Sequence, residues 1–236
     1  MPALKRIGHK GADLIAPGNT LESFDAAVAA GVDMIEFDVL PEDYRAPGTS
    51  RLVLAHDYSY DVRVAPSLED GLAHLAGLDV DLDVDMKIPG YEDRVVAALR
   101  TYGLVERSLI SSMYRDSLAR VRAIAPELRL GWSVPKVKRD YTQSHLYALP
   151  AYSYLIYHRR TLPGRAAGAI RAGAVDALMS HWRLVTPRLV QAVRAAGGEL
   201  YVWTVDEAPR IRALERLGVH GVITNDPRLF AGAPAA

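Results

Sequence analysis

The 236-residue chain contains no cysteine and carries no excess of either charge. Without cysteine it can form no disulfide and offers no thiolate to a metal ion. Its 28 basic side chains balance 28 acidic ones, so no overall field favours nucleic acid or an anionic membrane. No apolar run approaches the roughly 18 residues of a membrane span, and the N-terminus lacks the apolar core of a signal peptide. We therefore expect a cytoplasmic protein that binds no nucleic acid and has no stable membrane insertion.

Short apolar segments alternate with amphipathic segments along most of the chain. The strand-like segments are 6–9, 33–40, 80–87, 107–113, 128–134, 176–182, 199–206 and 221–227. The helix-like segments are 19–31, 67–77, 91–103, 115–126, 167–173, 186–198 and 208–218. About eight strand–helix units predict an α/β fold, a (β/α)8 TIM barrel forming one domain over residues 1–236. An open doubly wound sheet is the alternative.

Two segments depart from this alternation. Residues 51–57 form a short extended piece, which we interpret as a small cap after the second strand and not as a strand of the barrel. Residues 136–165 are rich in tyrosine and basic residues. Either this stretch is an elaborated loop whose tyrosines pack on the barrel rim, or it forms a wall of the ligand pocket.

The strand-like segment "DMIEFDVL" places two acids among apolar residues. Since side chains alternate along a strand, Glu36 and Asp38 share one face, and Ile35, Phe37 and Val39 share the other. In a barrel the two acids would point inward, where unpaired carboxylates cost several kcal/mol, an order-of-magnitude value. A divalent cation, Mg²⁺ or Ca²⁺, would neutralise them. A salt bridge to a neighbouring lysine or arginine is the alternative.

The segment "VDLDVDMK" repeats this pattern with more charge. Asp85 and Lys87 lie nearest its carboxyl end, where the chemistry of barrel enzymes takes place. Asp85 could complete a carboxylate trio and Lys87 could hold an anion, or the two could simply neutralise each other. Asp83 lies one pleat deeper, where we expect it to pair with a basic residue or to support the metal ligands.

Two histidines stand at comparable positions at the ends of extended segments. His9 closes the segment "RIGH", and His56 follows "RLVLA". Beside a carboxylate cluster, the two rings suggest general acid–base catalysis. Phosphoryl transfer needs a cation, a base and an acid, and Lys10 and Lys87 could add positive charge for a phosphate.

Taken in order, these segments resemble the glycerophosphodiester phosphodiesterase family of metal-dependent TIM-barrel enzymes. The resemblance spans nearly the whole chain. It rests on six segments, which are "GHKGADLIAPGNTLESF", "AGVDMIEFDV", "LVLAHD", "LDVDMK", "YVWTVDE" and "LGVHGVITNDP". They are similar to the family's HRG–PENT opening, its paired acids, its second histidine, its E-x-K strand and its two closing motifs.

The resemblance implies a role for each matching residue. The implied catalytic residues are His9 and His56, acting as general acid and base. The implied ligands of one divalent cation, Mg²⁺ or Ca²⁺, are Glu36, Asp38 and Asp85. The implied substrate contacts are Lys10, Lys87 and Trp203. The expected substrate is a small phosphodiester, cleaved to glycerol 3-phosphate and an alcohol, which would place the enzyme in glycerol and lipid metabolism.

Three positions depart from the family pattern. Lys10 replaces an arginine and loses the fork that binds phosphate through two hydrogen bonds. Gly18 stands where the family has glutamate, and Asp85 is one methylene shorter than the usual glutamate. These changes leave open a non-catalytic barrel that binds a phosphorylated ligand. A second rival hypothesis is a phospholipase D-like lyase, because related barrels act on lipid headgroups.

Overall fold

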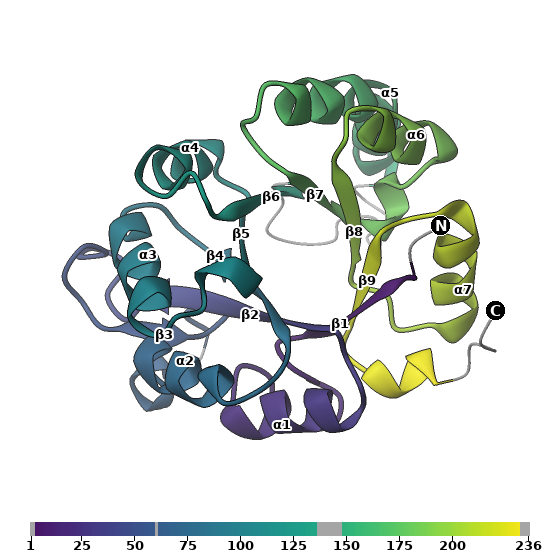
Figure 1. The fold of residues 1–236 in the computed structure, drawn as a ribbon. Coiled ribbons are helices and arrows are strands. Elements are labelled where there is room, and N and C mark those ends of the chain that lie inside the picture. The colour runs from purple at the N-terminus through teal and green to yellow at the C-terminus, as the bar shows by residue number, and fades with distance from the viewer. Residues whose placement is uncertain (1–2, 60, 136–147, 232–236) are drawn as a thin grey trace.

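The computed structural model describes residues 3–59, 61–135 and 148–231, where eight parallel strands close a barrel (Figure 1). Strand β1 pairs with both β2 and β9, which completes the ring. The barrel strands are β1 (Lys5–His9), β2 (Met34–Pro41), β4 (Asp81–Met86), β5 (Ser108–Ser112), β6 (Arg129–Val134), β7 (Ala177–His181), β8 (Glu199–Trp203) and β9 (Gly221–Thr224). The predicted TIM barrel is confirmed.

The extended piece after the second strand lies outside the ring. Strand β3 (Leu52–Leu54) pairs antiparallel with the end of β2, and the short 3-10 helix η1 (Val62–Val64) follows it. The interpretation of this segment as an excursion, and not as a barrel strand, is therefore confirmed. Its antiparallel direction carries the chain back across the carboxyl end of β2, towards the face where barrel enzymes bind their ligands.

Helices surround the strands on the outside (Figure 1). They are α1 (Leu21–Ala29), α2 (Leu68–Ala76), α3 (Glu92–Thr101), α4 (Arg115–Ile124), α5 (Ala148–Arg171), α6 (Pro187–Ala195) and α7 (Ala208–Leu217). Four further 3-10 helices are η2 (Val105–Arg107), η4 (Trp182–Leu184), η5 (Pro227–Phe230) and η1. Thr20 is the N-cap of α1 and forms a capping box with Ser23. Within the described residues, no helix combines the length and apolarity needed to cross a bilayer.

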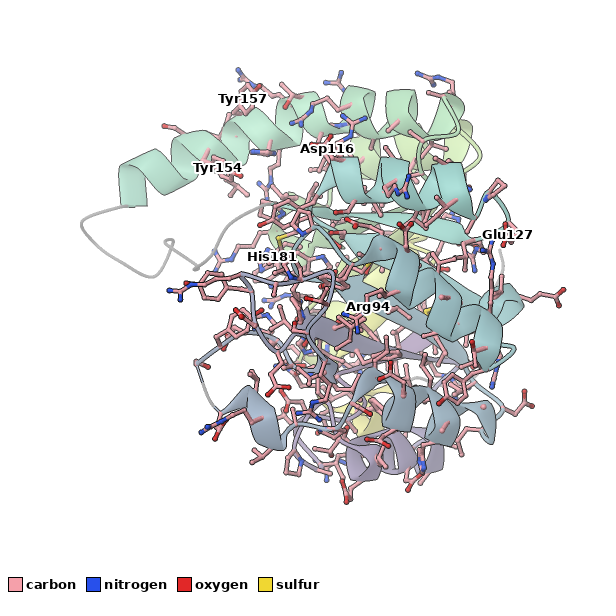
Figure 2. The ribbon with its side chains drawn as sticks, turned by 90° about the vertical axis from the view of Figure 1, so that its left-hand side faces the viewer. Arg94, Asp116, Glu127, Tyr154, Tyr157 and His181 are labelled. Atoms are coloured by element: carbon pink, nitrogen blue, oxygen red, sulfur yellow. The ribbon has the colours of Figure 1, made fainter. Side chains whose placement is uncertain are left out.

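Helix α5 differs from the irregular stretch predicted for residues 136–165. It begins at Ala148 instead of 167 and continues through Pro163, a residue that usually ends a helix. Tyr154 and Tyr157 are 40% and 57% exposed, so the expected packing of these two on the barrel rim is wrong (Figure 2). No described residue of α5 lines the pocket presented below. The prediction for residues 136–147 lies outside the described residues.

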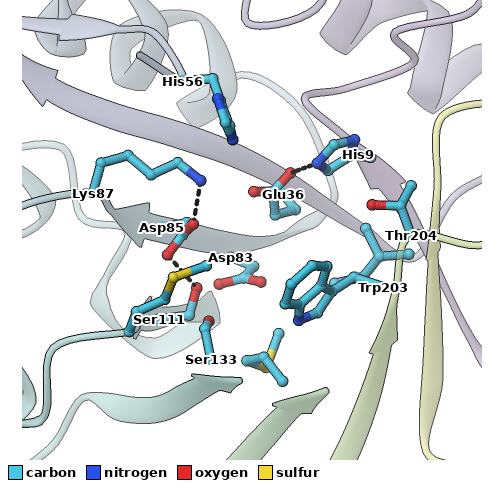
Figure 3. A pocket seen from close by; sticks show the side chains of 13 residues that line it. His9, Glu36, His56, Asp83, Asp85, Lys87, Ser111, Ser133, Trp203 and Thr204 are labelled. Carbon is cyan, nitrogen blue, oxygen red and sulfur yellow. Dashed lines mark hydrogen bonds and ion pairs between the residues drawn. The ribbon is translucent and has the colours of Figure 1, made fainter. Parts of the chain in front are cut away.

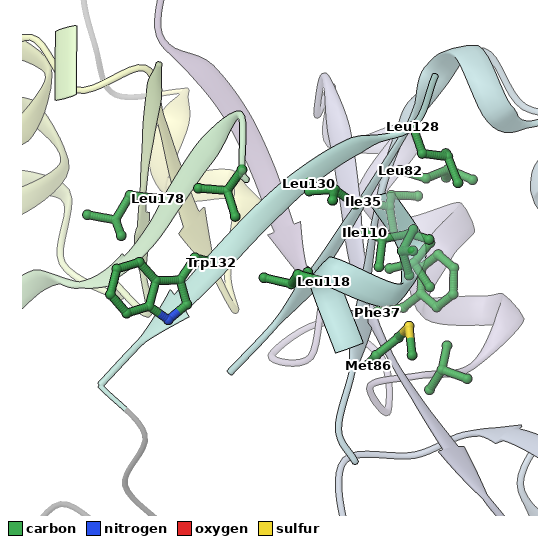
Figure 4. Packing of buried hydrophobic residues seen from close by; sticks show 14 of the residues in the cluster. Ile35, Phe37, Leu82, Met86, Ile110, Leu118, Leu128, Leu130, Trp132 and Leu178 are labelled. Atoms are coloured by element: carbon green, nitrogen blue, oxygen red, sulfur yellow. The ribbon is translucent and has the colours of Figure 1, made fainter. Parts of the chain in front are cut away.

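Two apolar layers lie on opposite sides of the barrel wall. The outer layer joins strands to helices and includes Ile35 and Phe37 (Figure 4). The inner layer fills the barrel below the carboxyl ends of the strands and consists of Ile7, Met34, Leu109, Ala177, Met179, Tyr201 and Ile223. Because this inner layer closes the interior from beneath, polar side chains that point inward above it face a pocket with a floor.

Gly8 lets the chain turn back sharply after β1. A Cβ atom at this position would lie 2.0 Å from the backbone oxygen of Gly11 and 3.3 Å from the Cβ of Ala27. Only a residue without a side chain fits between the strand and the loop that follows His9.

We expect Gly8→Ala to lower the free energy of unfolding by at least about 2 kcal/mol, since the backbone must move to relieve the overlap. Gly168→Ala in α5 is the matched control, because a Cβ there meets nothing within 4 Å. Better helix propensity should leave that variant as stable as the wild type or slightly more so. Urea unfolding followed by circular dichroism measures both, and equal stability of the two variants would contradict the expectation.

Candidate active site

A pocket of about 150 Å³ opens at the carboxyl ends of the barrel strands (Figure 3). It is lined by His9, Glu36, His56, Asp83, Asp85, Lys87, Ser111, Met113, Ser133, Met179, Trp203, Thr204 and Ile223. Both predicted histidines, two of the three predicted metal ligands, Lys87 and Trp203 are in this set. Residues from widely separated segments of the sequence therefore meet at the face where the barrel fold places its chemistry.

The three predicted carboxylate ligands converge beside this pocket. Each of Glu36, Asp38 and Asp85 offers an oxygen atom, and these oxygens lie within 4.8 Å of one another. The strand register brings them together, because β2 and β4 are parallel neighbours with Asp38 opposite Asp85. All three residues are buried. Such a set of hard oxygen donors matches the coordination preference of Mg²⁺ or Ca²⁺.

Lys87 neutralises part of this charge. Its Nζ lies 2.5 Å from Asp38 Oδ1 and 2.5 Å from Asp85 Oδ2. Although burial opposes the charge, the nearby carboxylates raise the pKa of Lys87 well above its ordinary value. The predicted alternative, in which Lys87 pairs with Asp85, is thus present in the structure. One ammonium among three carboxylates nevertheless leaves a net charge of two negatives.

The pKa of Glu36 reflects the negative charge that Lys87 leaves unbalanced. Burial, and then the negative charge of Asp38, raise the pKa of the Glu36 carboxyl well above its ordinary value. Asp38 behaves oppositely. Burial opposes its ionisation, but Lys87, the two histidines and the Asn19 hydrogen bond together lower the pKa of Asp38 below its ordinary value. A divalent cation carries the charge that would balance this group. The residues present therefore fit a single dication bound by Glu36, Asp38 and Asp85.

Two contacts from the loop between β1 and α1 hold these ligands in place. The Asn19 amide donates to Asp38 Oδ2 at 2.9 Å, and its Oδ1 accepts from the Asp38 backbone N–H at 3.0 Å. The Lys10 backbone N–H donates to Glu36 Oε2 at 2.9 Å. Both Asn19 and Lys10 have positive φ angles, 61° and 51°. This role of Asn19 was not predicted, because a left-handed asparagine gives no sequence signal of its own.

The ring of His9 is fixed by a hydrogen-bonded chain. Asn225 Nδ2 donates to Asp206 Oδ2 at 2.7 Å, which leaves Asn225 Oδ1 to accept from His9 Nδ1 at 2.5 Å. We assign the tautomer of His9 from this network, with the proton on Nδ1 and a lone pair on Nε2. Nε2 lies 3.8 Å from Glu36 Oε2. Burial lowers the pKa of His9 from its ordinary value of 6.5, which favours the neutral ring.

His56 approaches the same pocket from the segment after β3. Its Nδ1 lies 3.0 Å from Asp57 Oδ2, while its side chain is 51% exposed. The Ser59 side chain, then the His56 ring and then the Ser59 backbone N–H lower the pKa of Asp57 to about 2. With Nδ1 directed at Asp57, Nε2 is the nitrogen available to a ligand in the pocket.

Lys10 does not reach the pocket in this structure. Its ammonium lies 3.2 Å from Asp13 Oδ2, while Asp13 Oδ1 accepts from the Gly18 N–H at 2.8 Å. A Cβ at position 18 would lie only 2.4 Å from that same Asp13 oxygen. The Asp13 carboxylate therefore occupies the space in which a side chain at position 18 would begin. Its role was not predicted from the sequence.

Trp203 forms part of the pocket wall beside the ring of His181. The two rings meet edge to face, with centroids 5.2 Å apart. The Trp203 Nε1 atom has no hydrogen-bond partner among the described residues. An indole N–H is a donor only, so it can serve an acceptor on a ligand. Figure 3 shows the ring across the pocket from Lys87.

Asp83 lies in the same pocket without a basic partner. Neither carboxylate oxygen has a hydrogen-bond partner in the described part of the chain. Its burial raises the pKa of Asp83 to about 8, and the nearby Ser111 hydroxyl opposes this rise only in part. The predicted pairing of Asp83 with a lysine or arginine is therefore wrong. Lys87 lies too far along the strand and is directed to Asp38 and Asp85 instead.

Comparison with known proteins assigns the family. The profile of the Glycerophosphoryl diester phosphodiesterase family matches residues 9–41 and 63–229 of this chain. The chain belongs to this family. The match confirms the resemblance found in the sequence, and the enzyme class of the family is phosphodiesterase. Both matched ranges contain pocket residues, since His9 and Glu36 lie in the first and Asp85 and Trp203 lie in the second.

Other members of the family are similar along most of their length. The Glycerophosphodiester phosphodiesterase of Caldanaerobacter subterraneus is 24% identical over 94% of this chain and 93% of its own. A crystal structure of a glycerophosphoryl diester phosphodiesterase from Silicibacter pomeroyi has a TM-score of 0.76 at 22% identity, covering 97% and 92% of the two chains. An Oleispira antarctica phosphodiesterase, crystallised with its product sn-glycerol-3-phosphate, has a TM-score of 0.67 at 19% identity, covering 96% and 94%. These likenesses show that the barrel is shared.

We expect Asn19→Gly to weaken binding of Mg²⁺ or Ca²⁺ by roughly 10- to 100-fold, because Asp38 loses both hydrogen bonds that orient it. Glycine keeps the left-handed backbone at this position, so the change removes only the amide. Asn225→Ala is the control, since it loosens His9 without touching the carboxylate trio. Calorimetric titration with the metal alone measures both variants. Equal affinities for Asn19→Gly and the wild type would show that Asn19 does not organise the site.

Proposed function

We propose that this protein uses a divalent cation to hydrolyse glycerophosphodiesters to glycerol 3-phosphate and an alcohol. The observation that carries the proposal is the pocket itself, in which a buried carboxylate trio carrying two uncompensated negative charges lies beside two histidine rings. The sn-glycerol-3-phosphate bound to the Oleispira antarctica phosphodiesterase supports this substrate class. Mg²⁺ and Ca²⁺ both suit three carboxylate ligands.

The cation would be held by Glu36, Asp38 and Asp85. When bound, it supplies positive charge to the phosphate oxygens as negative charge develops on them. Lys87 adds a fixed ammonium at the edge of the same cluster, because its contacts with Asp38 and Asp85 hold it there. The phosphate of a diester is therefore drawn towards the side of the pocket that holds the cation and Lys87. Its leaving oxygen is directed to the opposite side of the pocket.

We assign the role of general base to His9. Its Nδ1 proton is held by Asn225, so the lone pair on Nε2 faces Glu36 and the pocket. Burial favours the neutral ring, which is the form that can accept a proton. His9 Nε2 then takes the proton from the attacking oxygen, and the Asp206–Asn225 chain keeps the ring in the orientation needed for the transfer.

His56 is left with the role of general acid. Its ring is half exposed, so it can exchange protons with solvent, and Asp57 orients it through Nδ1. In the protonated ring, Nε2–H donates to the alkoxide as the alcohol leaves.

We expect His9→Ala and His56→Ala each to lower kcat by roughly 10²- to 10⁴-fold, because each removes a proton-transfer group. EDTA should abolish wild-type hydrolysis of glycerophosphocholine, and added Mg²⁺ or Ca²⁺ should restore it. His74→Ala is the control, since that histidine lies outside the pocket and contacts Asp25. Choline release measures the rates. Full activity of both His9→Ala and His56→Ala would rule out the mechanism.

The pH dependence of kcat/KM tests the assignment of His9. Its pKa is lowered from 6.5, so the base stays neutral at pH 7, and kcat/KM should fall only as pH drops below 6.5. The hydrogen bond to Asn225 partly offsets this lowering. Its loss in Asn225→Ala should therefore move the acid limb of the profile to lower pH. An acid limb that keeps its midpoint in Asn225→Ala would show that another group is the base.

A further inference from the structure

Asp83 is a buried carboxylate that the proposed mechanism does not use. It is 1% exposed, it lines the pocket, and neither of its oxygens has a hydrogen-bond partner within the described residues. Figure 3 shows its carboxyl group between Asp85 and Trp203. A buried polar group without a hydrogen-bond partner is costly, and a hydrogen-bonding ligand in the pocket would satisfy it.

Asp83 lies at the deep end of the pocket. It precedes Asp85 by two residues on β4, which places it one inward-facing level deeper. Two inner-layer residues, Met179 and Ile223, line the pocket at this deep end. Asp83 is thus the last polar side chain of β4 before the apolar layer begins.

Two serines belong to the same part of the pocket. Ser111 on β5 and Ser133 on β6 are 2% and 6% exposed, and both line the pocket. The Ser111 hydroxyl is directed at Asp85 Oδ1, 3.4 Å away, so it links the Asp83 level to the carboxylate trio. A carboxylate together with two hydroxyls offers acceptors and donors at once, which matches the hydrogen-bonding needs of a polyol.

A count of charges distinguishes Asp83 from the three proposed metal ligands. One lysine and one dication together neutralise Glu36, Asp38 and Asp85. Asp83 is a fourth carboxylate beyond this balance, and its oxygens do not belong to the group of ligand atoms within 4.8 Å of one another. Its partner must therefore be something other than the first cation.

We propose that Asp83, with Ser111 and Ser133, forms a hydroxyl-binding subsite that holds the polyol end of the substrate. This inference rests on the proposed function and specifies which end of the diester enters first. Two residues of a strand span roughly 6 to 7 Å, which is the scale of a three-carbon polyol. The phosphate then lies at the carboxylate trio, the glycerol hydroxyls reach down to Asp83, and the alcohol points out to solvent.

The experiment compares glycerophosphocholine with bis(p-nitrophenyl) phosphate, a diester without free hydroxyls. Asp83→Leu keeps the branched shape of the side chain but removes both acceptors. We expect the ratio of kcat/KM for glycerophosphocholine to that for the aryl diester to fall roughly 10- to 100-fold. Asp83→Asn retains one acceptor and should give a smaller fall. Asp81→Asn on the same strand is the matched control, since Asp81 pairs with Lys5 at the other end of the barrel.

Four results would overturn the subsite. Unchanged kcat/KM for both diesters in Asp83→Leu would show that Asp83 does not touch the polyol, and equal fold-losses on both diesters would assign it a structural role. A metal titration in which Asp83→Leu removes a second binding event would make Asp83 a cation ligand instead. If the wild type hydrolyses neither diester, the proposed function is wrong. Calorimetry with glycerol 3-phosphate then still tests the subsite, and equal affinities for wild type and Asp83→Leu would refute it.

Discussion

The repulsion among buried carboxylates is the constraint on which the rest of the site depends. Glu36, Asp38 and Asp85 are held close by the pairing of β2 with β4, and they cannot separate without breaking that pairing. Lys87 removes only part of the charge. The protein tolerates this arrangement because the stability of the fold comes from elsewhere, from the apolar layers on both sides of the barrel wall.

The sequence predicted this cluster because strand alternation is a local rule. Glu36 and Asp38 point inward because side chains alternate between the two faces of a strand. The barrel is predicted by the succession of strand–helix units. The groups that orient the cluster come from distant segments, and no local rule finds them. Asn19 contacts Asp38 across 19 positions and Asn225 contacts His9 across 216. Such contacts become visible only when the barrel closes and brings β9 next to β1.

The two errors of prediction have different physical causes. Helix α5 was missed because its first half projects exposed side chains such as Tyr154 and Tyr157, so it lacks the apolar periodicity that marks a packed helix. For Asp83 we expected either a basic partner or a supporting role beside the metal ligands, and the first alternative is wrong. In the structure, Lys87 is directed to Asp38 and Asp85. Buried polar groups without a partner are typical of functional sites, and Asp83 is such a group inside the pocket.

The departures from the family pattern in the first loop compensate one another. Gly18 lacks the carboxylate of the family's glutamate, and the Asp13 carboxylate accepts the Gly18 N–H at the point where a side chain at position 18 would begin. Lys10 gives up the guanidinium fork, but its ammonium pairs with Asp13, and its contribution to the site comes from its backbone N–H on Glu36. Because that contact uses the main chain, it depends on the left-handed backbone at position 10 and not on the lysine side chain. The loop therefore supplies Glu36 with a backbone donor and places a carboxylate beside position 18.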